Sequence, residues 1–107
     1  GTMARGDVVT DIIAVGNAAG GASGWPTIQP GSGVEWVIKC IAGSNTNDLW
    51  LDSFDGSIYT PIVDCGQLAV RCGLVTIPIT NGHYLRIRNT SSTTSYVVGY
   101  SGYITKE

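Results

Sequence analysis

His83 is the only histidine among the 107 residues, and histidine is the side chain that most often serves as a general acid or base near neutral pH. It directly follows Asn81-Gly82, a dipeptide typical of tight turns, where a histidine is usually solvated. The sequence contains no Gly-x-Ser-x-Gly or His-Glu-x-x-His motif, and the glycine-rich stretch 16–24 is not followed by a helical pattern. We therefore predict that the protein is not an enzyme. A pocket that brought His83 within hydrogen-bond distance of a carboxylate would instead favour a small hydrolase or lyase.

Asp48, Asp52 and Asp55 lie close together in the sequence, and carboxylates grouped in this way can bind calcium. The segment lacks the regular spacing of oxygen ligands and the terminal glutamate of an EF-hand loop. Asp48 and Asp52 are also separated by about 13 Å along an extended strand, at ~3.3 Å per residue. Asp55 begins a predicted turn, a role that needs no metal. We expect no metal ion and no other cofactor.

The three cysteines, Cys40, Cys65 and Cys72, are too few for structural zinc beside a single histidine, and no Cys-x-x-Cys pair is present. Three small buried residues are the simplest interpretation, because free cysteine is among the most buried residue types. A bridge between Cys65 and Cys72 in an oxidising compartment, with Cys40 as a buried thiol, is the alternative. The sequence leaves both open.

Tyr84, Arg86 and Arg88 lie on one face of a predicted strand, and aromatic and cationic groups together can bind a sugar or a nucleic acid. Pairing of the two arginines with carboxylates on a neighbouring strand is the more frequent arrangement. Trp25, in a loop before a proline, is the tryptophan that we expect at the surface. The residues predicted to form an interface are Trp25, Tyr84, Arg86, Arg88 and Tyr103.

The elements that position these side chains are predicted to be short strands. No segment repeats apolar residues with the helical period, whereas apolar or alternating runs recur about every 8–12 residues between polar or glycine-rich turns. The predicted strands are residues 7–15, 34–42, 48–54, 57–63, 74–80, 83–89 and 96–105, with a short extended piece at 25–30. Residues 16–24 are predicted to form an irregular loop, and 64–73 a loop or short strand. Seven or eight short strands predict one all-β domain, an antiparallel β-sandwich, jelly roll or barrel.

The segment 34–42 alternates most clearly, with Trp36, Ile38 and Cys40 on its apolar face and Ile41 on the opposite, more polar face. The residues predicted to lie in the core are Trp36, Ile38, Leu49, Leu51, Leu85 and Ile87.

Turn and proline positions predict how the strands connect. Asp55-Gly56 and Asn81-Gly82 are typical of type I′ hairpin turns. Prolines at 25–30 and Pro61 within 57–63 predict that both segments lie at sheet edges.

Charge is scarce in this sequence. Charged residues make up 13% of the chain, against about 25% in typical domains, and Lys and Arg number 6 against 8 Asp and Glu. A net charge of -2 gives no basic surface for nucleic acid, and no apolar run approaches the roughly 20 residues of a membrane helix. Loops of Gly, Ser, Thr and Asn with so few charges protect poorly against self-association, so we predict a homo-oligomer.

Three stretches are similar to small all-β virion proteins of tailed bacteriophages and related viruses: IQPGSGVEW at 28–36, the 54–56 turn, and HYLRIRNT at 83–90 with YSGY at 100–103. The resemblance implies a head-decoration, turret or fibre-associated domain, commonly a trimeric jelly roll on the exterior of the virion. It also implies that a viral capsid protein is the partner and that there are no catalytic residues.

We therefore expect a non-catalytic structural protein, residues 4–107, that binds the capsid surface as an oligomer, with a trimer favoured. Residues 1–3, Gly1-Thr2 before Met3, look like a remnant of tag removal. The alternative function is a carbohydrate-binding or receptor-binding β-sandwich, which an exposed row of Trp25 and tyrosine side chains would favour.

Overall fold

The computed structural model describes residues 4–70 and 73–107, and in this part of the chain eight strands form two four-stranded antiparallel sheets. The predicted tag remnant at residues 1–3 lies outside it. In sheet order, the first sheet contains β1 (Val8–Val15), β8 (Tyr96–Lys106), β3 (Glu35–Gly43) and β6 (Leu74–Thr80). The second contains β2 (Thr27–Ile28), β7 (Tyr84–Asn89), β4 (Leu49–Phe54) and β5 (Tyr59–Pro61).

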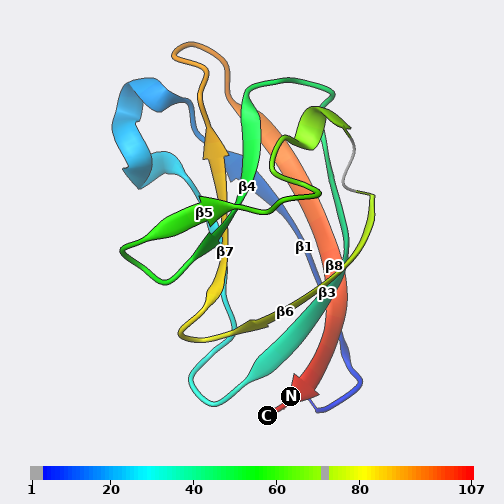
Figure 1. Cartoon of the computed structure of the whole chain (residues 1–107). Coiled ribbons are helices and arrows are strands. Elements are labelled where there is room, and N and C mark those ends of the chain that lie inside the picture. The colour runs from blue at the N-terminus through cyan, green and yellow to red at the C-terminus, as the bar shows by residue number, and fades with distance from the viewer. Residues whose placement is uncertain (1–3, 71–72) are drawn as a thin grey trace.

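The chain crosses between the two sheets at almost every connection, and the resulting strand order is that of a jelly roll. The predicted all-β sandwich of about eight short strands is thereby confirmed. Figure 1 shows the two sheets facing each other, with the two chain ends at the same end of the sandwich. Hydrogen bonds from Gly6 N to Ile104 O (2.8 Å) and from Ile104 N to Asp7 O (3.0 Å) hold these ends together.

The core lies between the inner faces of the sheets and is built from aliphatic side chains of both. Of the six predicted core residues, five are at most 1% exposed, namely Ile38, Leu49, Leu51, Leu85 and Ile87. Trp36 is half-buried and packs against this cluster.

The pattern predicted for the 34–42 strand is wrong after Ile38, because a β-bulge between Ile38 and Cys40 adds a residue to β3 relative to its neighbour β8. The extra residue shifts the alternation, so Ile41 enters the core with no exposed surface, and Cys40 is only partly buried. The alternation of apolar and polar residues along a strand does not show where a bulge inserts an extra residue.

The two predicted hairpin turns have different outcomes. The β4–β5 hairpin is present, but the register pairs Phe54 with Tyr59, so its tip is Gly56-Ser57, one residue later than predicted. Gly56 has a φ of +97°, which favours glycine, and Asp55 stabilises the turn from its first corner.

The Asn81-Gly82 turn closes through Thr80 N donating to His83 O (2.8 Å), but it joins β6 and β7, which belong to opposite sheets. It is therefore a crossover and not a hairpin. Asn81 is tied to the preceding loop, because its side chain donates to Pro30 O (3.0 Å) and its carbonyl accepts from Gln29 (2.7 Å).

The remaining segments contain short 3-10 turns, at Ala18–Gly24 and Leu68–Val70. The first corrects the prediction of an irregular loop at 16–24. Its start is fixed by Asn17, whose side-chain oxygen accepts a hydrogen bond from Ala19 N (3.1 Å). In the described residues, no helix is long and apolar enough to cross a membrane.

Candidate interaction surface

The outer face of the β2-β7-β4-β5 sheet carries a dense cluster of arginine and aromatic side chains, which we call the arginine face. It consists of Trp25, Trp50, Asp52, Phe54, Tyr59, Tyr84, Arg86 and Arg88. Arg86 and Arg88 point outward because Leu85 and Ile87, their neighbours along β7, fill the core. The register places Asp52 of β4 directly opposite Arg86.

Asp52 holds both arginines. Its Oδ2 accepts hydrogen bonds from Arg86 Nη2 (2.9 Å), Arg86 Nε (3.3 Å) and Arg88 Nε (2.9 Å), while Oδ1 accepts from Arg88 Nη2 (3.2 Å). The carboxylate has no exposed surface, and the side chains of Arg86 and Arg88 are 9% and 16% exposed. The predicted cross-strand pairing with a carboxylate is therefore present, although two cations share one anion.

Aromatic rings cover the two guanidinium groups. The Arg86 Cζ atom lies 4.2 Å from the centroid of the Tyr59 ring and 4.6 Å from that of Phe54, and Arg88 Cζ lies 5.1 Å from Tyr59. Trp25 and Trp50 complete the layer, each with its ring centroid 5.2 Å from an arginine Cζ atom. The negative faces of these rings offset part of the excess positive charge.

Four of the five residues predicted to form an interface therefore meet on this face, but their side chains are packed against one another within the chain. Tyr84 is 8% exposed and contacts Phe54 edge to face, with the ring centroids 5.7 Å apart. Trp25, predicted at the surface, is partly buried, because Ile87 N donates a hydrogen bond to Pro26 O (3.0 Å) that holds the segment against β7. The arginine face is thus mainly a structural feature.

The outer face of the β1-β8-β3-β6 sheet is different, and we call it the apolar face. Its outward residues are Val8, Thr10, Ile12 and Ala14 of β1, Val97, Gly99, Ser101 and Tyr103 of β8, Val37, Lys39, Cys40 and Ala42 of β3, and Leu74, Thr76 and Pro78 of β6. Its large apolar side chains are strongly exposed: Ile12 by 75%, Val8 by 57%, Val97 by 55% and Leu74 by 91%. Tyr103, the fifth predicted interface residue, lies here and is 47% exposed.

Charge is almost absent from the apolar face. In the described strands its charged groups are Lys39, whose Nζ donates to Thr76 (2.8 Å), and the exposed Glu35–Lys106 pair (3.5 Å) at one end. An exposed apolar sheet surface of this kind is a typical interaction site.

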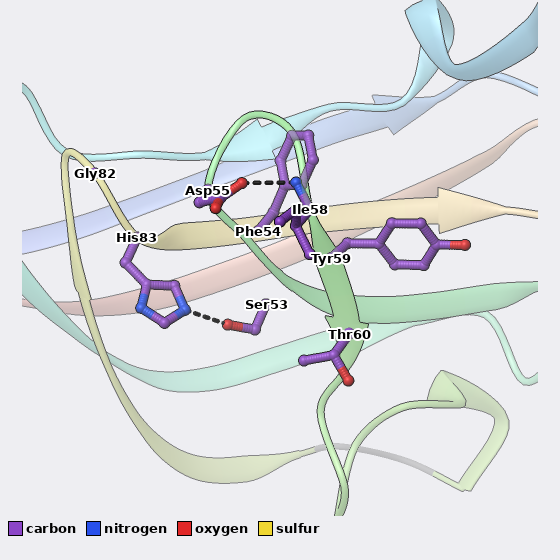
Figure 2. A pocket seen from close by; sticks show the side chains of 8 residues that line it. All are labelled: Ser53, Phe54, Asp55, Ile58, Tyr59, Thr60, Gly82 and His83. Atoms are coloured by element: carbon purple, nitrogen blue, oxygen red, sulfur yellow. Dashed lines mark hydrogen bonds between the residues drawn. The ribbon is translucent and has the colours of Figure 1, made fainter.

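A hollow of about 260 Å³ opens between the β4–β5 hairpin and the turn before β7. Figure 2 shows the His83 ring pointing toward Ser53, and the distance from Nε2 to the Ser53 Oγ is 2.6 Å. Asp55, also in the hollow, is occupied by the turn, because its Oδ1 accepts hydrogen bonds from Ile58 N (2.7 Å) and Ser57 N (2.8 Å). These two bonds lower the pKa of Asp55, with a smaller contribution from His83. Within residues 4–70 and 73–107, no carboxylate is hydrogen-bonded to His83.

The aspartates considered as calcium ligands have separate partners. Asp48 accepts a hydrogen bond from the Tyr96 hydroxyl (2.6 Å), whereas Asp52 and Asp55 bind the arginines and the turn as described. The part of the chain that the structure describes contains no group of three or more metal-ligating side chains.

The cysteines are distributed between two environments. Cys65 is 4% exposed and takes part in a disulfide, and Cys40 is a free, partly buried thiol. Cys72, the partner predicted for Cys65, lies outside the described residues.

The exposed row of aromatic side chains that would favour carbohydrate binding is not found in the described residues. Tyr59 and Tyr103 are the two strongly exposed tyrosines, and they lie on opposite outer faces of the sandwich. Trp25 is packed against Arg86.

No protein-family model, no curated protein and no solved structure matches the chain. Its function is therefore inferred from its own surfaces.

Proposed function

We propose that the protein is a non-catalytic structural component of a virus particle, which binds the capsid exterior as a homo-oligomer, with a trimer as the expected oligomer. The observation that carries the proposal is an exposed, nearly uncharged sheet face on a jelly roll. Jelly rolls are a recurrent architecture of viral capsid proteins and lectins. An apolar face agrees better with the first of these two uses, because a sugar-binding site is polar.

The arrangement of the polar side chains supports a structural role. The buried carboxylate of Asp52 binds two arginines, and Asp48 and Asp55 stabilise Tyr96 and a turn. His83 is paired with Ser53 without a carboxylate to orient its ring in the described residues. Polar groups held in this way stabilise the domain but do not form a site for acid–base chemistry.

The carbohydrate-binding alternative has less support. Sugar-binding modules present aromatic rings to solvent, whereas here Trp25 and Trp50 lie against arginine side chains. The strongly exposed tyrosines are divided between two faces.

The proposal is tested on particles of the virus that encodes the chain. Gold-labelled antibody against the purified protein should decorate the outside of intact particles, and the protein should sediment with them. Antibody against an internal virion protein, which should label only disrupted particles, is the control. Protein that remains in the soluble fraction of the infected cells, separate from the particles at every stage, would contradict the proposal.

A further inference from the structure

The four edge strands are all protected against pairing with another chain. β2 is two residues long and lies between Pro26 and Pro30, and β5 ends at Pro61 after three residues. β6 contains Pro78, and the remaining edge strand, β1, carries Asp11. Proline cannot donate a backbone hydrogen bond, and a charged residue on an edge strand opposes strand addition. A second molecule therefore approaches this sandwich more easily over a sheet face than along an edge.

The two glycines in the middle of β8 have different explanations. A Cβ atom on Gly102 would collide with Val37 O and with Ile38 Cα, so the close approach of β3 requires glycine there. On Gly99 the nearest atoms would be Asp11 O at 3.8 Å and Ile12 Cγ1 at 3.9 Å, which are ordinary contacts, and its φ is not in the left-handed region.

The part of the chain that the structure describes therefore gives no steric reason for glycine at position 99. Gly99 lies on the apolar face, paired with Ile12 of β1 and Ala42 of β3. A glycine within a strand often marks a place where another backbone comes close. Because glycine has no side chain, the surface of the face is lower at this position, beside Ile12 and Val97.

The dimensions of the face suit a partner of the same kind. β8 has 11 residues, so at ~3.3 Å per residue and ~4.8 Å between strands the four-stranded face measures roughly 36 by 19 Å, or about 700 Å². A standard protein interface takes about 800 Å² from each partner. Apart from Lys39 and the Glu35–Lys106 pair at one end, the described strands place no charge on this face that would select an acidic or a basic partner. An identical face meets its requirement for an apolar surface.

We infer that the apolar face is the surface on which a second copy of this chain packs, sheet against sheet, with the β1–β8 half at the centre of the contact. The inference rests on the proposed function, in which the protein acts as a homo-oligomer, and it specifies the surface of one contact in that oligomer. Because the same face packs on itself, this contact alone joins two copies. Aligned sheets pack about 10 Å apart with their side chains interdigitated. The exposed Ile12, Val97 and Tyr103 would then be buried between the two copies.

The chain offers a matched pair of variants for the test. Ile12 on the apolar face is 75% exposed, and Ile58 in the β4–β5 turn is 74% exposed. Sedimentation velocity over a micromolar concentration series should show an oligomer for the wild type and for Ile58→Lys. Ile12→Lys should weaken association by roughly tenfold or more, because a charge is then buried in an apolar contact. Val97→Lys should have the same effect, and circular dichroism of all variants checks that each is folded.

Three results are informative. Loss of association in Ile12→Lys and Val97→Lys but not in Ile58→Lys supports the inference. An oligomer that both apolar-face variants leave unchanged overturns it, while the proposed role in a particle stands. A wild type that is monomeric throughout the series overturns the inference and the homo-oligomer together, and particle labelling then decides whether the protein binds the capsid as single copies.

Discussion

The two outer faces of the sandwich belong to sheets of equal strand number, but their side chains differ in chemistry and in exposure to solvent. On the arginine face, the charged groups of Arg86, Arg88 and Asp52 are almost fully covered by one another and by aromatic rings. On the apolar face, Ile12 and Val97 are more than half exposed with little charge near them. The first face covers its own charged groups, whereas the second leaves apolar surface in water. The contrast is the basis of our proposal that the apolar face binds a partner while the arginine face stabilises the domain.

The largest expected effect is on the arginine face. Asp52→Asn should destabilise the protein by about 3–5 kcal/mol, because it leaves two buried guanidinium groups without their anion. Asp11→Asn, on the exposed edge of the other sheet, should change the free energy of unfolding by less than about 0.5 kcal/mol. Urea denaturation measures both. Similar losses for the two variants would mean that the Asp52 cluster is not the stabilising element that we describe.

The two glycines of β8 lie on opposite sides of the β1-β8-β3-β6 sheet, Gly102 on the inner side and Gly99 on the apolar face. Gly102→Ala should cost about 1–3 kcal/mol, because its methyl group has no space beside β3. Gly99→Ala should be neutral or should stabilise the isolated domain by up to about 1 kcal/mol, since the new methyl group meets no close contact. Thermal unfolding at low protein concentration measures both. A clear loss in Gly99→Ala would show that the glycine is needed by the fold itself.

Two tyrosines with equal exposure, Tyr59 and Tyr103 at 47%, test the comparison directly. Tyr59→Leu should cost about 1–2 kcal/mol, because it removes ring contacts to both arginines. Tyr103→Leu should change the stability of the single chain by less than about 0.5 kcal/mol and should instead alter self-association. Unfolding and sedimentation measured on the same samples distinguish the two. Equal effects on stability would remove the contrast between the faces.

The smallest expected effect is on the stability of the protein at low pH, through Asp55. Hydrogen bonds from Ile58 N and Ser57 N lower the pKa of Asp55 below its ordinary value of 3.8. The unfolded chain then takes up this proton first, so the stabilisation is present above pH 3.8 and is lost as the pH falls through the lowered pKa. Carbon NMR of the Asp55 carboxyl group should give a midpoint below 3.8. The stability difference between wild type and Asp55→Asn should shrink in the same range, and a midpoint above 3.8 would contradict the turn geometry.

Much of the fold was predictable from local patterns. The strand at 74–80 was predicted with its observed limits, and Pro61 correctly indicated an edge strand. The bulge after Ile38 and the crossover at Asn81-Gly82 were not predicted, because both depend on where a strand pairs in space. A turn dipeptide is the same whether the following strand returns to its own sheet or enters the other one.

The candidate surface was less predictable than the fold. The five predicted interface residues were chosen for their chemistry, and four of them turned out to be packed within their own chain. The partner of the two arginines, Asp52, could have been found from the alternation of Trp50, Asp52 and Phe54, which share one face of β4. No local pattern predicted the apolar face, because Ile12 and Val97 are typical strand residues. Only the topology places them on the same outer face, with no further element packed over them in the described residues.

The most direct test of the account is the mass of the wild-type protein in solution, measured by light scattering on a column over a range of dilutions. We predict a mass of at least twice the 11.2 kDa of one chain, which falls to the mass of a single chain only on dilution. A mass of 11.2 kDa that does not change with concentration would mean that the apolar face stays open to water, and it would contradict the self-association at the centre of this account.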